Sequence, residues 1–332
     1  MRIASLRQEA KNSWPSASSP PQTDAPQTSS RVERRGATFP EISGYLGSGG
    51  EADHEGISIF RGTMVLIQDM REANDMEALI EKVAELVFSS KRIVVFTGAG
   101  ASTESGIADF RSPGGVWEKY NPEDFYFQKF LASEQSREKY WQMSTEMYAS
   151  LRDAKPSRVH QAVAELEKLD KLDCVITQNI DGLHHKAGNS REKIIELHGN
   201  ALSVSCLSCG KKYDRDEVQE RIRKGVTVPR CDDCEGLLKP DTISFGQAMP
   251  VRETNEAYKR SLESDLFVVV GSSLVVQPAA SMPINAKQGG AKLVIINRDP
   301  TPHDGYADVV LNGPAGEIVE RVLAKVKKKI RT

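Results

Sequence analysis

The stretch RIVVFTGAGASTESGIADFR occupies residues 92–111. Its first part, Ile93 to Phe96, is β-branched or aromatic and a glycine follows closely, as in a short buried strand. Gly98 and Gly100 then allow a tight turn in which the backbone approaches a ligand. Such turns after buried strands often bind phosphate or ribose through backbone N–H groups. An ordinary strand-to-helix turn has the same composition, so this stretch alone leaves both interpretations open.

Three further stretches have the same buried-strand character: CVITQ from Cys174, LFVVVGSS from Leu266 and KLVIIN from Lys292. Apolar residues at helical spacing occur between or around them, at 76–90, 157–169, near 281–289 and at 315–330. Apolar strands that alternate with amphipathic helices predict an α/β fold of Rossmann-like type, with a parallel sheet covered by helices on both faces. Ligands on such sheets bind at the carboxyl ends of the strands.

The chain has 332 residues and a net charge of -2. This length suits one large α/β domain with a smaller insert, or two domains. The nearly balanced charge gives no general attraction to nucleic acid or anionic membranes. No apolar run reaches the ~20 residues of a membrane-spanning helix, and the first residues lack the apolar core of a secretory signal. We therefore expect a cytoplasmic protein without membrane or direct nucleic-acid partners.

The first 63 residues differ from the rest. The segment SWPSASSPPQTDAPQTSS at 13–30 is rich in Ser, Pro, Thr and Gln and poor in aliphatic side chains. Because it can bury little apolar surface, we expect residues 1–63 to be a disordered extension, with Met64 or Met70 as alternative true starts. The predicted domain is 64–330, in which 76–111, 157–198 and 247–330 form the main sheet and its helices, and 112–156 (helical, aromatic-rich) and 199–246 form a smaller lobe.

Two Cys-x-x-Cys pairs predict a metal site. They comprise Cys206, Cys209, Cys231 and Cys234. Four thiolates at this spacing can close a tetrahedral zinc site without an open position for water, so we expect a structural zinc ion. A redox pair or a chance pattern is the alternative. A nucleic-acid finger is disfavoured because Asp232, Asp233 and Glu235 are acidic, and Cys174 is expected to be an inert core thiol.

Polar residues follow the second predicted strand. TQNIDGLHHKAG at 177–188 places Gln178, Asn179 and Asp181 at a carboxyl-end loop, although a turn rich in Asn, Asp and Gly would explain them without function. His198 follows a short apolar stretch and is the preferred general base because its free pKa lies near neutrality. The competing histidines are His160, expected to pack on a helix, His184 and His185, expected to be solvated, and His303.

Two more strand ends offer small polar groups for ribose and phosphate. These are Gly271, Ser272 and Ser273 in VVVGSSLVVQPA, and Asn297 in VIINRDPT. The chain has no Gly-x-x-x-x-Gly-Lys-Ser/Thr motif, which excludes a phosphate-loop NTPase. The glycine after Gly98 and Gly100 is Gly106, which disfavours a hydride-transfer dehydrogenase.

Together these motifs resemble the sirtuins, a family of NAD-dependent protein-lysine deacylases, over residues 76–330. GAGASTESGIADFR, TQNIDGLHHKAG, ELHGN, the doubled Cys-x-x-Cys, ISFGQAMP, VVGSSLVVQPA and INRDPT occur in family order. SSLVVQPAA and AGEIV look most like archaeal and bacterial members. The resemblance implies cleavage of NAD with transfer of the acetyl group from lysine, which releases nicotinamide, O-acetyl-ADP-ribose and free lysine.

The resemblance also implies roles for individual residues. It makes His198 the general base, with Asn179 and Asp181 also at the catalytic centre. The NAD-binding set is Gly98, Ala99, Gly100, Ser102, Thr103, Ile107, Phe110, Arg111, Gln178, Asn179, Asp181, Gly271, Ser272, Ser273, Asn297, Arg298 and Ala315. Ile243, Phe245 and Gly246 are expected to line the acyl-lysine tunnel, where an acetyl-lysine peptide or protein adds as a strand. A mono-ADP-ribosyltransferase and a non-enzymatic zinc-containing binding module are the alternatives.

The chain departs from the family pattern at several positions. Ala108 replaces a common proline before Asp-Phe-Arg, so that loop is expected to be more flexible. Gln247 and Met249 replace the usual Glu and Leu at the peptide-binding edge. Desuccinylating members carry Tyr-x-x-Arg in the helical insert, whereas Tyr140 is followed here by Met143. We therefore expect uncharged acyl groups, acetyl first.

Overall fold

The structure is a computed structural model that describes residues 73–110 and 114–332. The expected disorder of residues 1–63 and the role expected for Arg111 lie outside the described residues. By their contacts, all described residues belong to one unit, Ile57–Thr332.

A six-stranded sheet with the order β3-β2-β1-β7-β8-β9 confirms the predicted fold class. Its strands are β1 (Ile93–Thr97), β2 (Leu172–Thr177), β3 (Ile194–Glu196), β7 (Leu266–Val270), β8 (Lys292–Asn297) and β9 (Val309–Asn312). Every neighbouring pair is parallel. The central strand β1 is buried along its whole length, which explains its continuous apolar sequence.

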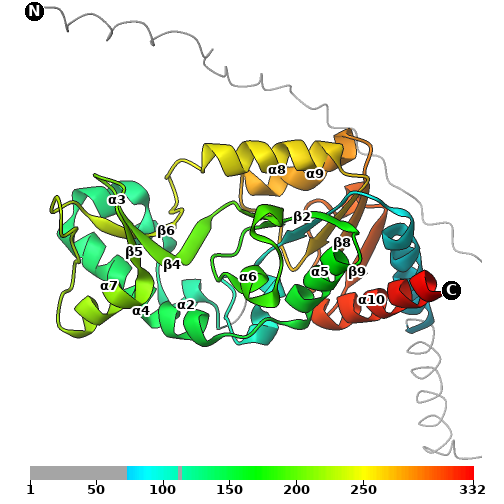
Figure 1. The fold of residues 1–332 in the computed structure, drawn as a ribbon, viewed down its shortest axis with the longest axis horizontal. Coiled ribbons are helices and arrows are strands. Elements are labelled where there is room, and N and C mark those ends of the chain that lie inside the picture. The colour runs from blue at the N-terminus through cyan, green and yellow to red at the C-terminus, as the bar shows by residue number, and fades with distance from the viewer. Residues whose placement is uncertain (1–72, 111–113) are drawn as a thin grey trace, which may run out of the picture. The chain divides into compact units, whose positions relative to one another are not determined.

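Helices cover both faces of this sheet (Figure 1). Ile93 and Val95 pack into one core cluster together with apolar residues of the helix at 73–89, α5 (Arg158–Lys168) and α10 (Ala315–Arg331). Val94 and Phe96 pack into the other cluster, with α8 (Val251–Glu263) and α9 (Met282–Gln288). The alternation follows from the two-residue period of a strand, which sends successive side chains to opposite faces.

A second, antiparallel sheet has the order β5-β4-β6. Its strands are β4 (Gly199–Cys206), β5 (Lys212–Asp214) and β6 (Leu238–Thr242), accompanied by α2 (Val116–Lys119), α3 (Phe127–Ala132), α4 (Glu134–Asp153) and α7 (Arg215–Arg223). Trp141 of α4 is 1% exposed and packs with Val204, Tyr213 and Leu238. The inserts at 112–156 and 199–246 therefore share a core, while the exact domain boundaries stay a prediction.

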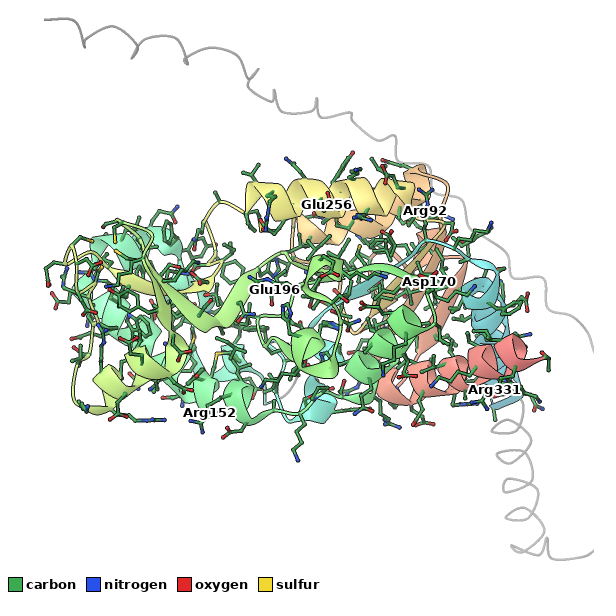
Figure 2. The ribbon with its side chains drawn as sticks, in the orientation of Figure 1. Arg92, Arg152, Asp170, Glu196, Glu256 and Arg331 are labelled. Carbon is green, nitrogen blue, oxygen red and sulfur yellow. The ribbon has the colours of Figure 1, made fainter. Side chains whose placement is uncertain are left out.

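Short elements complete the connections. They are η1 (Ala99–Ala101), η2 (Thr103–Ser105), η3 (Pro122–Phe125), α6 (Leu183–Ala187), η4 (Arg191–Lys193), η5 (Ala279–Ser281) and η6 (Asp304–Tyr306). Charged side chains such as Arg92, Arg152 and Arg331 are exposed (Figure 2). Within the described ranges, no helix is both long enough and apolar enough to cross a membrane.

Candidate active site

A cavity of about 670 Å³ opens where β1, β2, β7 and β8 end. Its opposite wall comes from α4 and from the loop after β6. The residues predicted from sequence that line it are Ala99, Gly100, Thr103, Phe110, Gln178, Asn179, His198, Ile243, Phe245, Gly246, Gly271, Ser272, Ser273, Asn297, Arg298 and Ala315. Gly98, Ser102, Ile107 and Asp181 are not part of the lining.

Two turns meet backbone against backbone at one end of this cavity. Gly100, in the turn after β1, donates its N–H to the Gly271 carbonyl after β7 at 2.8 Å. A Cβ at Gly98 would lie 2.7 Å from the Gly271 oxygen, and one at Gly271 would lie 2.4 Å from the Ala101 nitrogen. Gly271 also has a φ of 65°, which side-chain-bearing residues rarely adopt. Bare backbone therefore borders the cavity here.

The polar residues after β2 are held in one buried network. Asn179 donates from Nδ2 to the Gly98 carbonyl and to Ser102 Oγ, both at 3.0 Å. Ser102 Oγ donates to Asp181 Oδ2 at 2.7 Å, and the Leu183 N–H donates to Asp181 Oδ1 at 2.9 Å. Asn179 lines the cavity, whereas Ser102 and Asp181 are buried behind it. Ser102 and Asp181 thus fix the position of the Asn179 side chain, which reaches the cavity.

His198 follows β3 and lines the same cavity. Its Nδ1 lies 3.0 Å from the Gln178 carbonyl oxygen, which only accepts, so Nδ1 carries the proton and Nε2 is an acceptor. Burial lowers the pKa of His198 below its usual value, against an opposing effect of the Gln178 carbonyl. The ring is therefore neutral at pH 7 and can take up a proton.

The structure corrects the expected environment of His184. This side chain was expected to be solvated, but it is 2% exposed within α6. Its ring lies 4.7 Å from that of His160, which is buried on α5 as expected. His185 is exposed, 3.5 Å from Glu196. The packing of α5 on α6 buries His184, and local sequence does not reveal that contact.

The loop after β6 contains Ile243, Phe245 and Gly246, the residues expected to line the acyl-lysine tunnel. β6 ends at Thr242, and the Gln247 N–H donates to the Ser244 carbonyl at 3.0 Å, which closes a turn. The Phe245 carbonyl accepts from the Phe127 N–H, and the Gly246 carbonyl accepts from Gln128 Nε2, both at 2.9 Å. These two hydrogen bonds attach the loop after β6 to α3.

A family model described as "Sir2 family" matches residues 98–278 of the chain. "NAD-dependent protein deacetylase 1" of Bradyrhizobium diazoefficiens is 45% identical over 245 residues, which are 74% of this chain and 95% of that relative. The chain belongs to the Sir2 family. "NAD-dependent protein deacylase 2" of Archaeoglobus fulgidus is 43% identical over 254 residues, or 76% of this chain and 98% of that relative.

Solved Sir2 structures have the same fold. The structure titled "Structural Basis for the Mechanism and Regulation of Sir2 Enzymes" has a TM-score of 0.69 and 43% identity, covering 76% of this chain and 99% of that chain. "Structure of Sir2Tm bound to a propionylated peptide" has a TM-score of 0.68 and 36% identity, covering 74% and 98%.

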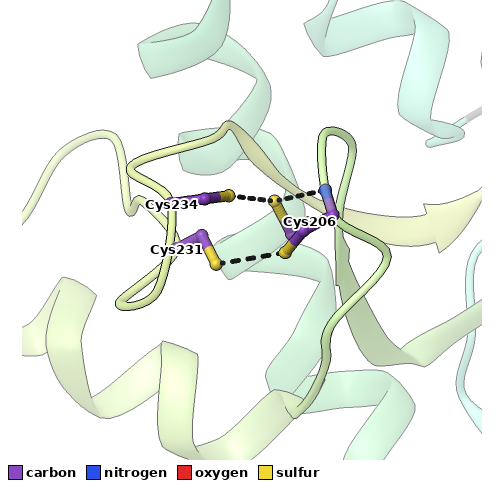
Figure 3. Close-up of side chains that lie close together, drawn as sticks. Cys206, Cys231 and Cys234 are labelled. Atoms are coloured by element: carbon purple, nitrogen blue, oxygen red, sulfur yellow. Dashed lines mark hydrogen bonds between the residues drawn. The ribbon is translucent and has the colours of Figure 1, made fainter.

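In this Sir2 chain the four cysteines converge outside the cavity lining. Their sulfur atoms all lie within 4.8 Å of one another. Cys206 Sγ lies 3.5 Å from Cys234 Sγ, and Cys231 Sγ lies 3.6 Å from Cys209 Sγ. Figure 3 shows how these side chains face one another. Ligands about 2.3 Å from a tetrahedral zinc ion are about 3.8 Å apart, so the arrangement fits zinc.

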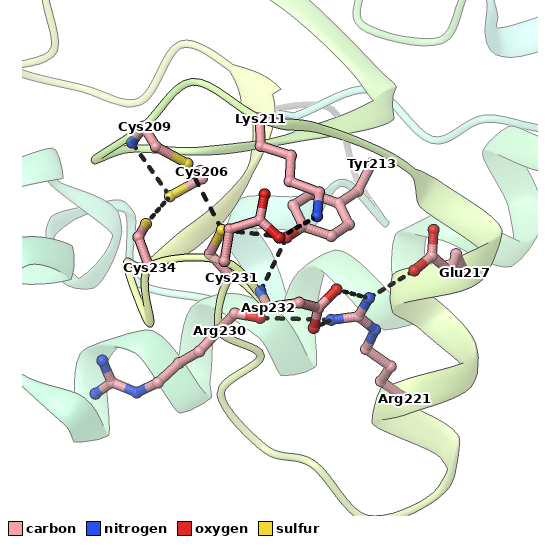
Figure 4. Close-up of polar contacts among 11 residues, drawn as sticks. Cys206, Cys209, Lys211, Tyr213, Glu217, Arg221, Arg230, Cys231, Asp232 and Cys234 are labelled. Carbon is pink, nitrogen blue, oxygen red and sulfur yellow. Dashed lines mark hydrogen bonds and ion pairs between the residues drawn. The ribbon is translucent and has the colours of Figure 1, made fainter.

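Groups around the cysteines complement thiolate charge. Figure 4 shows Tyr213, whose hydroxyl donates to Cys231 Sγ at 3.2 Å. The Ser208 and Cys209 N–H groups donate to Cys206 Sγ at 3.4 and 3.5 Å. The neighbouring acidic residue Asp232 is paired with Arg221 at 2.7 Å, so its carboxylate is engaged on the protein surface.

Sequence analysis connected only Tyr140 and Met143 of one wall of the Sir2 cavity with the substrate. Residues of α4 at positions i, i+3, i+4, i+7, i+8 and i+11 line it, namely Tyr140, Met143, Ser144, Met147, Tyr148 and Leu151. This helical period is visible in the sequence and could have indicated a shared face. Trp141 flanks this face but is buried in the core of the small lobe, so periodicity alone does not tell which residues meet the cavity.

Proposed function

We propose that this chain is an NAD-dependent protein-lysine deacetylase that transfers the acetyl group of lysine to ADP-ribose. One observation carries the proposal. The neutral imidazole of His198 opens into the same cavity as the bare-backbone turns at Gly100 and Gly271. A proton acceptor thus shares one site with a cradle suited to a dinucleotide. The names of the relatives, NAD-dependent protein deacetylase and deacylase, support the same conclusion.

The residues present fit NAD. A Cβ at Gly98 or Gly271 would clash with the facing turn, so the two turns stay close together as bare backbone, and small hydroxyl and amide groups at Ser272, Ser273 and Asn297 line the cavity beside them. We assign the pyrophosphate and adenosine ribose to these groups, with Ala99, Gly100, Thr103, Arg298 and Ala315. A solved Sir2 homologue bound to ADP-ribose, at 37% identity and a TM-score of 0.68, supports this assignment. Bound NAD supplies a glycosidic bond whose cleavage releases nicotinamide and makes ADP-ribose the acyl acceptor.

The chain's own residues then orient the reactants and move one proton. Asn179 projects from its buried network at the end of the cavity that we assign to nicotinamide. His198 Nε2 accepts a proton from a ribose hydroxyl, because its Nδ1–H is fixed on the Gln178 carbonyl. Ser272 Oγ donates to Gln178 Oε1 at 2.7 Å, which ties the β7 turn to the same loop.

We assign the acyl-lysine side chain to the channel lined by Ile243, Phe245 and Gly246. The Ile243 N–H donates to the His198 carbonyl at 2.8 Å, so the channel begins beside the general base. Phe110 and Trp117, with ring centroids 5.4 Å apart, provide an apolar wall. The zinc held by the four cysteines has a structural role, because all four ligand positions are sulfur.

We place the reaction in the cytoplasm, in line with bacterial and archaeal relatives and five cysteines without a disulfide. The substrate is an acetylated lysine in a protein or peptide, and we assign no nucleic-acid partner.

Incubation with NAD and an acetyl-lysine peptide library tests the proposal. Mass spectrometry is expected to show nicotinamide, deacetylated peptide and O-acetyl-ADP-ribose in equal amounts. ADP-ribosylated protein without deacetylated peptide would identify a mono-ADP-ribosyltransferase. Intact NAD in the presence of every peptide would leave a zinc-containing binding module as the remaining function.

A further inference from the structure

The buried imidazole of His184 lies behind the polar residues that follow β2. We propose that His184 is a positioning residue for Asn179, acting through Thr97 and Thr177, and that its loss loosens the nicotinamide end of the NAD site. This inference rests on the proposed function, since it assigns that end of the cavity to nicotinamide. His184 does not line the cavity, so its effect passes through other residues.

Two threonines at adjacent strand ends connect His184 to Asn179. Thr97 and Thr177 are register partners of β1 and β2, and each precedes one of the loops that border the cavity. Thr97 Oγ1 donates to Thr177 Oγ1 at 2.9 Å. The Asn179 N–H then donates to Thr177 Oγ1 at 3.0 Å. The position of the Asn179 backbone therefore depends on the position of the Thr177 hydroxyl oxygen.

The contact between His184 and Thr97 determines which group donates in each of these hydrogen bonds. His184 Nε2 lies 3.0 Å from Thr97 Oγ1. Because Thr97 gives its only hydroxyl proton to Thr177, its oxygen can only accept from His184, and the imidazole proton is on Nε2. His184 therefore donates to Thr97, and Thr97 donates to Thr177. An imidazole that donates at this position keeps the Thr97 proton directed toward Thr177.

A second imidazole ties the same network to the turn after β1. The ring of His160 lies 4.7 Å from that of His184. Its Nδ1 accepts from the Ser157 N–H at 3.2 Å, while Ser157 Oγ donates to the Ala101 carbonyl at 2.7 Å. The helices α5 and α6 thus reach both cavity loops through hydrogen bonds, not through apolar contact alone.

An apolar side chain could fill the volume of His184 but not this bonding role. Thr97 is completely buried, so without the imidazole its oxygen would lose a donor that water cannot replace at no cost. The Thr97 hydroxyl would then be free to turn away from Thr177. Asn179 would lose its fixed backbone and, with it, the bonds from Nδ2 to Gly98 and Ser102.

The test compares H184L with H184Q, because a glutamine amide can still donate toward Thr97. V95A, a cavity-forming change in β1 that touches none of these bonds, controls for lost stability. For each full-length variant we would measure the KM for NAD, the KM for acetyl peptide, nicotinamide inhibition and calorimetric binding of NAD. H184L is expected to raise the KM and Kd for NAD and the nicotinamide inhibition constant about tenfold, with the peptide KM within about twofold of wild type. H184Q and V95A are expected to retain wild-type values.

The inference would be overturned if folded H184L kept the wild-type KM and Kd for NAD and the wild-type nicotinamide inhibition constant. It would also be overturned if V95A changed these constants as much as H184L does. Thermal unfolding identifies the temperature range in which all variants are folded. If the wild-type chain binds NAD but does not turn it over, the proposed function fails while the calorimetric comparison still decides the role of His184. If the wild-type chain does not bind NAD, both fail.

Discussion

Ser102 Oγ donates to Asp181 Oδ2 at 2.7 Å, although 79 residues separate them along the chain. The bond joins the turn after β1 to the loop after β2, and both side chains are buried. A hydrogen bond to a carboxylate in a low-dielectric site is stronger than one between neutral groups. This single bond therefore sets the spacing of two loops that border the cavity.

S102A is expected to weaken use of NAD by about 10- to 100-fold in KM, because a charge-assisted bond contributes about 1.5–3 kcal/mol. S105A is a matched control, since Ser105 lies in the same turn and its buried Oγ has no partner among the described residues. Steady-state kinetics with NAD as the varied substrate measures the difference. Equal constants for the two variants would mean that the Ser102–Asp181 bond does not shape the NAD site.

H198A is expected to fold and keep zinc while deacetylation falls by about 100-fold or more, the usual contribution of a general base. H185A, which changes an exposed histidine in the neighbouring loop, is expected to leave turnover unchanged. Product formation by mass spectrometry and zinc content by a colorimetric chelator give the two measurements. Wild-type turnover in H198A would remove this residue from the proposed role.

The pH dependence of deacetylation follows from the environment of His198. Burial lowers its pKa, so the unprotonated ring predominates above the usual value of 6.5. Loss of kcat/KM is therefore expected only on acidification below about pH 6.5, as the base becomes protonated. A rate that keeps rising between pH 7 and 8.5 would show that a group with a higher pKa limits the reaction.

Removal of zinc is expected to destabilise the small sheet without direct damage to the cavity. C231S should abolish binding of one zinc ion per chain and lower the Tm by at least about 5 °C, because metal binding at a four-sulfur site contributes to folding. C174S, at the buried thiol of β2, should keep the zinc ion. Zinc retained in C231S, or an unchanged Tm after chelation, would contradict a structural role.

Much of the fold could be predicted from sequence because the main strands are buried on both faces. Continuous apolar runs such as Val268–Val270 mark such strands clearly. β9, at the sheet edge, was not predicted, because its apolar run covers only Val309–Leu311 between Asp308 and Asn312. The zinc ligands were predicted from their spacing alone, and the structure brings their sulfur atoms together.

Burial of polar residues was harder to predict. The sequence HH at 184–185 contains one buried and one exposed side chain, and only the packing of α5 against α6 distinguishes them. The turn in the loop after β6, where Gly246 has a φ of 74°, was also not predicted from the sequence. Both differences depend on contacts between segments far apart in sequence, which a local pattern does not contain.

Acetyl peptide is expected to be deacylated at least about tenfold faster than succinyl peptide. Met143 lines the cavity on α4, and no lysine or arginine is among the described α4 residues that face it. Burying a carboxylate there without a paired cation is costly. Rates for peptides that differ only in the acyl group measure the preference. Faster succinyl removal would contradict it and would point to Arg215, whose Nη2 lies 3.2 Å from Ser144 Oγ behind the cavity wall.

The folded chain is expected to lose stability steadily on mild acidification. Burial lowers the pKa of His160 to about 4 and that of His184 well below 6.5, so both rings stay neutral in the folded state. The unfolded chain takes up these protons near pH 6.5. Between that pH and about 4 the unfolded state therefore binds more protons at His160, and on acidification the free energy of unfolding falls by about 1.4 kcal/mol per pH unit for this ring; His184 acts in the same direction.

Urea titrations at pH 7.0 and 5.0 measure this slope. H160N keeps an acceptor for the Ser157 N–H but removes one titrating ring, so the stability difference between the two pH values should shrink by roughly 2 kcal/mol. H185N, which changes an exposed histidine, is the control variant and should leave the difference unchanged. Protonation of the zinc ligands contributes equally to all three proteins and cancels in the comparison. An identical pH dependence in H160N and wild type would mean that His160 is protonated in the folded chain.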